Sequence, residues 1–133
     1  MISLTTPAGQ LGWLAAPFDL PGTDGLRHTL ESVRGAKGTV VMFICNHCPY
    51  VIDDTQEVGR DYGAVCTPDF FGFDRDLRLA YRGRLDASGR SSDPAAPREL
   101  FAAMLEVART GKVSGIQHPS VGCSIKWASD PDA

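Results

Sequence analysis

The sequence predicts a single α/β domain spanning residues 1–133, and three features support that prediction. An uninterrupted run of β-branched and aromatic residues at 39–44 is typical of a buried strand. Pairs of short strands are predicted on either side of it, and the segment 98–110 has the apolar spacing of a helix. Because 43 % of the residues are hydrophobic, the chain can bury an ordinary core without disulfide staples.

The strands are predicted from their composition and from the turns that separate them. A hairpin is expected at 18–30, where a turn rich in Gly and Asp joins two short strands. The run 39–44 does not alternate, so we expect a strand covered on both faces. A second hairpin is expected where the turn 74–76 joins 70–73 to 77–84.

Two helices are predicted, and they differ in strength. The stretch 50–62 has a loose helical period that Gly59 weakens, so its helix should be of low intrinsic stability. The helix 98–110 is better defined and stops at Gly111. The N-terminal stretch and the tail 112–133 are expected to be irregular.

Composition and charge exclude several classes of function. The net charge of -3 does not provide the basic surface of a nucleic-acid-binding protein. No apolar run approaches the ~20 residues needed to cross a bilayer, and the first twenty residues lack the pattern of a secretory leader. We therefore expect a cytoplasmic protein that binds neither nucleic acid nor membrane.

The chemistry is expected at Cys45-Asn46-His47-Cys48-Pro49, which follows the buried strand directly. Pro49 suits the first turn of a helix, whose positive N-terminal end would favour a thiolate at Cys45. The spacing allows Cys48 to close a disulfide onto Cys45, and a protonated His47 would make the couple more oxidising. The motif predicts a redox-active dithiol with Cys45 attacking and Cys48 resolving.

Other interpretations of these residues remain open. A Cys-x-x-Cys can form half of a zinc site, but the remaining candidate ligands show no second paired spacing; they are Cys66, Cys123, His28 and His118. The dithiol could instead hold a soft ion such as Cu(I). His47 could also be an exposed residue without a role.

The order of motifs resembles the thioredoxin superfamily, in particular its redoxin branch, which is related to alkyl hydroperoxide reductase and thiol-specific antioxidant proteins. The resemblance rests on 39–49, on Gly63-Ala64-Val65-Cys66-Thr67-Pro68-Asp69 with the hairpin after it, on 18–25, and on Gly122-Cys123-Ser124-Ile125-Lys126-Trp127. It implies a thioredoxin-like fold, with a central sheet flanked by helices and preceded by an N-terminal hairpin. It also implies a cis peptide at Thr67-Pro68 that faces the dithiol and presents the Thr67 backbone to a substrate strand.

The sequence departs from this family in two respects. The Thr or Ser and the Pro that a peroxiredoxin places before its peroxidatic cysteine are absent, since Met42 and Gly38 stand before Cys45. Nineteen residues separate Cys48 from Pro68, where the family places the rest of a helix, a parallel strand and another helix. We therefore expect one parallel strand and one helix of that fold to be missing, and a homodimer could cover the sheet edge that their loss exposes.

These observations together predict a thiol-disulfide oxidoreductase. Cys45, Cys48 and His47 would be its catalytic residues, and Thr67 and Pro68 would bind the substrate. The reaction needs a protein or small-molecule disulfide and an external thiol electron donor, but no cofactor and no metal. The alternatives are a copper-binding or other soft-metal-binding protein and a non-catalytic deletion remnant.

Overall fold

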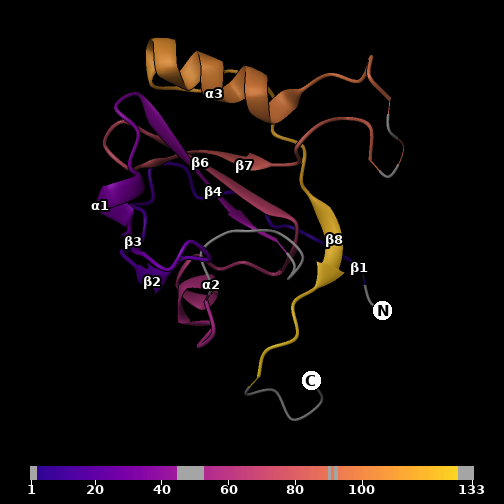
Figure 1. Ribbon diagram of the computed structural model, residues 1–133. Helices are drawn as coiled ribbons and strands as arrows, with labels where there is room; N and C mark the ends of the chain where they lie inside the picture. The colour runs from indigo at the N-terminus through magenta and orange to yellow at the C-terminus, as the bar shows by residue number, and fades with distance from the viewer. Residues whose placement is uncertain (1–2, 45–52, 90, 92, 129–133) are drawn as a thin grey trace.

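The computed structural model describes residues 3–44, 53–89, 91 and 93–128 (Figure 1). The strands of this part are β1 (Ser3–Thr5), β2 (Asp19–Pro21), β3 (Arg27–Thr29), β4 (Gly38–Phe43), β5 (Cys66–Thr67), β6 (Asp69–Asp74), β7 (Leu79–Gly83) and β8 (Val121–Ser124). The helices are α1 (Leu30–Val33), α2 (Glu57–Asp61) and α3 (Glu99–Thr110). The protein is a mixed α/β chain, as the sequence predicted.

The described strands form three small antiparallel sheets instead of the one central sheet that was expected. The largest has the order β4-β6-β7, with β4 paired to β6 from Gly38 opposite Asp74 to Phe43 opposite Asp69. β2 and β3 form a separate hairpin, and β8 lies between β1 and β5 in the third sheet. All of these pairings are antiparallel. A parallel strand paired with β4 is therefore absent from the described residues.

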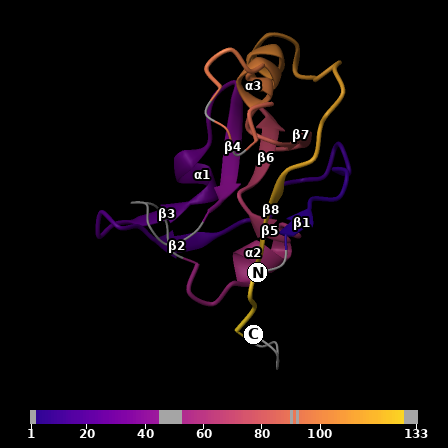
Figure 2. The ribbon, with the colours of Figure 1, turned by 90° about the vertical axis from the view of Figure 1, so that its right-hand side faces the viewer.

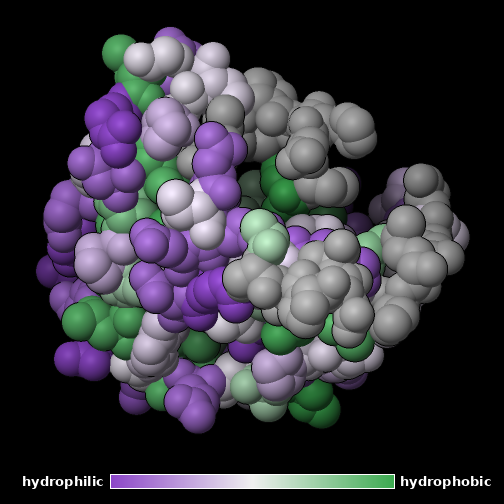
Figure 3. Space-filling model, turned by 90° about the horizontal axis from the view of Figure 1, so that it is seen from below, coloured by the Kyte–Doolittle hydropathy of each residue, from purple (hydrophilic) through white to green (hydrophobic). Residues whose placement is uncertain are grey.

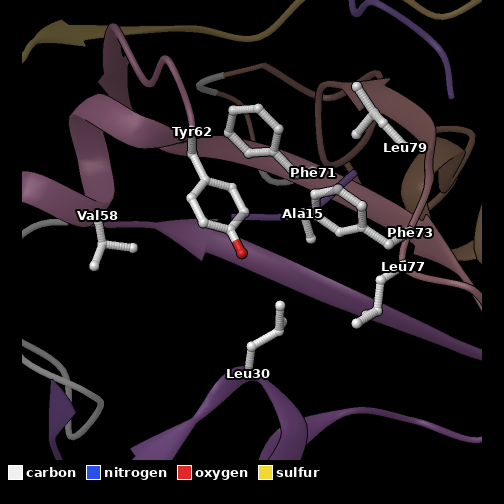
Figure 4. Close-up of a cluster of buried hydrophobic side chains, with 8 residues drawn as sticks. All are labelled: Ala15, Leu30, Val58, Tyr62, Phe71, Phe73, Leu77 and Leu79. Atoms are coloured by element: carbon white, nitrogen blue, oxygen red, sulfur yellow. The ribbon is translucent and has the colours of Figure 1, made fainter. Parts of the chain in front are cut away.

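Two apolar clusters pack against the two faces of the β4-β6-β7 sheet. α3 lies over one face, where Leu100 and Ala103 pack on Phe70 and Tyr81 (Figures 1 and 2). The larger cluster lies on the other face, because Phe71 and Phe73 alternate with Phe70 along β6. Figure 4 shows its members, which are Ala15, Leu30, Val58, Tyr62, Phe71, Phe73, Leu77 and Leu79. Tyr62 stands edge-on to Phe71 at 5.7 Å between ring centroids, a favourable geometry for aromatic rings.

The strand β4 is less buried than its sequence predicted. Val41 and Phe43 pack against the larger cluster, whereas Val40 and Met42 point to the opposite face and are exposed. The expectation of a strand covered on both faces was therefore wrong. One face of β4 is buried against the larger cluster. On the opposite face α3 approaches Gly38, but Val40 and Met42 remain exposed.

Both predicted hairpins and the longer helix are confirmed. β2 pairs with β3 and β6 pairs with β7, although Leu30 begins α1 and does not end the strand. α3 ends where Gly111 takes a positive φ of 78° and donates its N–H to the Val107 carbonyl at 2.8 Å. α2 has five residues, much shorter than the predicted 50–62, of which 50–52 lie outside the described residues.

The two ends of the chain are more ordered than their sequences predicted. The N-terminal stretch contributes β1 and the tail contributes β8, which pair from Ser3 opposite Cys123 to Thr5 opposite Val121. Thr6 and Ser120 extend this contact, because the Thr6 N–H donates to the Ser120 carbonyl at 2.9 Å. The expectation of an irregular tail was thus wrong over 121–124.

The described surface is largely polar on the side opposite α3, where hydrophilic side chains occupy much of the view in Figure 3. Among the described helices, none is long and apolar enough to cross a membrane.

Candidate functional site

The candidate site is a corner of the backbone between β5 and β6. The peptide bond between Thr67 and Pro68 is cis, as the resemblance implied, and it separates the two strands. Before the corner, Cys66 and Thr67 pair with Ser124 and Cys123 of β8. After it, Asp69 begins β6 and joins the β4-β6-β7 sheet. The corner therefore links two of the three sheets.

The end of β4 lies beside this corner. Phe43 is the register partner of Asp69, the residue that follows Pro68. Ile44 is the last described residue before the predicted dithiol, and Cys45 follows it in the sequence. The three predicted catalytic residues, Cys45, His47 and Cys48, lie outside the described residues, whereas Thr67 and Pro68 lie within them.

A buried ion pair stands directly behind the corner. The Arg82 guanidinium donates from Nη2 to Asp69 Oδ2 at 2.9 Å, and Asp69 is fully buried. Arg82 also donates to the Gly63 carbonyl at 3.0 Å and lies 4.5 Å from the centre of the Phe71 ring. Burial raises the pKa of the Asp69 carboxyl, and the hydrogen bond from Arg82 opposes that rise. The pair ties β7 to the first residue of β6 and to Gly63, which lies before β5.

The two cysteines near the corner differ in their surroundings. Cys66 is completely buried, and burial, followed by the negative charge of Asp69, raises the pKa of its thiol. A raised pKa disfavours the thiolate, which is the reactive form, and complete burial is typical of a cysteine that packs as a small apolar side chain. Cys123 is partly exposed and lies opposite Thr67. Because register partners share a face and successive residues alternate, Cys123 lies on the opposite face of this sheet from Cys66.

The tail closes tightly over the strand that precedes the corner. Gly122 approaches Thr67 so closely that an added Cβ atom would overlap the Thr67 carbonyl. Further along, Gln56 donates to the Lys126 carbonyl at 3.1 Å and accepts from the Ala128 N–H at 2.7 Å. The Trp127 ring lies 4.4 Å from the Arg60 guanidinium of α2. These contacts hold the tail against both β5 and α2.

Ligand groups suited to a metal are not gathered in the described part of the chain. There, no cluster of three or more His, Cys, Asp or Glu side chains has the arrangement of a metal site. His28 instead forms a contact of 2.9 Å with Asp24 and belongs to the β2–β3 hairpin, whereas Cys66 and Cys123 belong to the β1-β8-β5 sheet.

The ion pair of Asp69 and Arg82 is the feature that sequence reasoning missed. Charged residues are rarely buried, so an Asp at the start of a strand is normally read as part of an exposed turn. The sequence contains one signal, because Arg82 interrupts the apolar run of β7. A charge at that position predicts a buried partner or an exposed face, and the sequence alone does not distinguish them.

Comparison with solved structures relates the whole chain to other proteins. It superposes with a TM-score of 0.87 on an uncharacterized conserved protein from Geobacillus kaustophilus, at 32 % identity and over 98 % of each chain. The chain belongs to the same family as the protein from Geobacillus kaustophilus. A hypothetical protein, SMc02350 from Sinorhizobium meliloti 1021, matches with a TM-score of 0.84 at 28 % identity, over 95 % of this chain and 99 % of that one.

Both solved proteins share the architecture described above. No family model matches the chain, and no curated protein matches it.

Proposed function

We propose that the protein is a thiol-disulfide oxidoreductase of thioredoxin-like architecture whose reaction takes place at the corner between β5 and β6. The observation that carries the proposal is the register between β4 and β6. Phe43 pairs with Asp69, so the strand that leads to the Cys45-x-x-Cys48 motif ends beside the cis peptide at Thr67-Pro68. A dithiol supplies the attacking and resolving thiols of disulfide exchange, and a backbone edge beside it is suited to bind the extended main chain of a protein substrate.

The proposed reaction begins at Cys45. Its thiolate attacks one sulfur of a substrate disulfide, so that a mixed disulfide forms and the other substrate sulfur leaves as a thiolate, which takes a proton from water. The Cys48 thiolate then attacks the Cys45 sulfur and releases the second substrate thiol. The substrate is reduced by two electrons, the dithiol is oxidised, and an external thiol donor restores it.

The other residues of the site have supporting roles in this proposal. His47, when protonated, stabilises the thiolate form of the dithiol. Thr67 and Pro68 receive the extended main chain of the substrate in the manner of an added strand. Cys66 takes no part, because its buried thiol resists ionisation.

The proposal is tested by the reduction of insulin disulfides with a thiol donor and catalytic amounts of the protein. The Cys45→Ser variant should lose the acceleration completely. The Cys48→Ser variant should accumulate a mixed disulfide with the substrate, visible as added mass on Cys45. Cys66→Ala is the matched control and should retain activity. Activity that persists when Cys45 and Cys48 are both replaced by Ser would exclude the proposal.

A further inference from the structure

One edge of the main sheet lacks a strand partner among the described residues. In the order β4-β6-β7, β4 is paired through β6 alone. Soluble proteins protect such edges with charged residues, proline or a bulge. The strand Gly38–Phe43 contains no charged residue and no proline, and the irregularity in this sheet lies between β6 and β7 at Gly72 and Phe73.

Apolar side chains extend from this edge over the face that α3 covers. Gly38, Val40 and Met42 alternate onto one face of β4, and Met104 of α3 lies against Gly38. Val40 is 38 % exposed and Met42 is 43 % exposed, so α3 does not reach across the remainder of the strand. Figure 2 shows β4, β6 and β7 next to one another beneath α3.

α3 presents a matching apolar flank on the same side. Glu106 accepts a hydrogen bond from the Ser114 N–H at 3.1 Å, and the loop containing Ser114 continues to Gln117, which bonds to β7. The flank with Glu106 therefore faces β7. Helical periodicity places Phe101 on the other flank, three residues from Met104 and toward β4. Phe101 is 67 % exposed.

We propose that a second copy of this chain covers this surface, with β4 pairing antiparallel to β4 of the partner about a twofold axis perpendicular to the sheet. Such an axis keeps both α3 helices on the same face of a continuous sheet of six strands. The Phe101 flank of one copy then meets that of the other above the seam. Val40 and Met42 of both copies are buried beneath the helices.

A second copy fits this surface better than an extended peptide does. A peptide strand would pair with the edge of β4, but it would leave Phe101 of α3 exposed. An identical chain supplies a strand edge and an apolar helix flank in one contact. An uncharged edge also pairs with its own copy without placing like charges opposite one another. The inference does not depend on the thiol chemistry proposed above.

Sedimentation velocity on the full chain, under reducing conditions and over a concentration range of about a hundredfold, tests the inference. We expect a species of twice the 14.3 kDa chain mass that dissociates on dilution. Phe101→Arg and Met42→Arg each place a charge in the seam and should weaken dimerisation by about tenfold or more. Ile116→Arg is the matched control, because Ile116 is an exposed apolar residue of the loop after α3 and should leave dimerisation unchanged.

Amide hydrogen exchange of the peptide containing residues 38–44 is a second test, and it uses the unmodified protein. Its amides should become more protected as the protein concentration rises, because β4 gains a strand partner. A monomer at every concentration would overturn the inference. A dimer that persists unchanged in both arginine variants, or exchange that is independent of concentration, would also overturn it.

Discussion

At the scale of single residues, Arg82 shows how a charge can be stable in a core. Its guanidinium satisfies Asp69 and the Gly63 carbonyl while resting on the Phe71 ring. Removing two charges from water has a large free-energy cost, and their mutual attraction offsets that cost when both groups are fully hydrogen-bonded. The pair therefore matters less as a source of net stability than as a fixed connection beside the corner at Pro68.

Removing Arg82 should be far more costly than removing an arginine at the surface. Arg82→Met leaves the Asp69 carboxylate buried without a counter-charge, so we expect a loss of about 3–5 kcal/mol in the free energy of unfolding. Arg27→Met is the control, since the Arg27–Asp19 pair is exposed and should contribute about 1 kcal/mol or less. Urea unfolding measures both. Similar losses in the two variants would contradict the buried pair, and Asp69→Asn combined with Arg82→Met should recover part of the stability.

At the scale of elements, the sequence predicted the parts whose structure is set by local pattern. The hairpins of β2–β3 and β6–β7 followed from turn residues between short strands, and α3 followed from its apolar spacing and Gly111. β8 could not be predicted in this way. Val121–Ser124 contains a glycine and small polar side chains, and it becomes a strand because β1 and β5 supply partners on both sides.

The candidate site likewise contains features that the sequence predicted and features that it did not. Thr67-Pro68 and the dithiol were predicted from motifs in the sequence, and the cis peptide is observed. The ion pair behind the corner depends on residues thirteen positions apart, with no local pattern to connect them. The exposure of Val40 and Met42 was missed because an apolar run alone does not reveal whether both faces of a strand are covered.

The pairing of β5 with β8 makes a prediction about Gly122. A methyl group there would overlap the Thr67 carbonyl, which is backbone and cannot turn aside. We expect Gly122→Ala to lower the free energy of unfolding by about 1–3 kcal/mol as β8 is forced from β5. Gly115→Ala is the matched control, because that position has open space. Equal stability of the two variants, measured by thermal or urea unfolding, would show that β8 does not approach Thr67.

At the scale of the whole molecule, buried ionisable groups predict instability at alkaline pH. Burial raises the pKa of Tyr81 to about 12, and it also raises the pKa values of Tyr62 and of the Cys66 thiol. As the pH rises through the ordinary pKa values of these groups, the unfolded chain loses protons that the folded chain retains. The contribution of these groups to the free energy of unfolding is therefore fully present below their ordinary pKa values, and it decreases as the pH rises above them.

Urea unfolding at about pH 8 and about pH 11 measures this effect, which amounts to at most about 1.4 kcal/mol per pH unit for each group. Tyr81→Phe should reduce the slope, although losing the hydrogen bond from its hydroxyl to the Arg84 carbonyl costs about 1 kcal/mol at every pH. Stability that does not change between the two pH values would contradict the burial of these side chains.

The reactivity of Cys45 tests the central claim, that this chain assembles a redox-active dithiol, most directly. Alkylation of the folded protein should be followed against pH, with each cysteine resolved by peptide mass mapping. We predict that Cys45 titrates one or more units below the ordinary thiol value of ~8.5, while Cys66 reacts slowly because it is buried. If Cys45 instead titrates at the ordinary value, like an exposed thiol, the account of an activated dithiol beside the Thr67-Pro68 corner is contradicted.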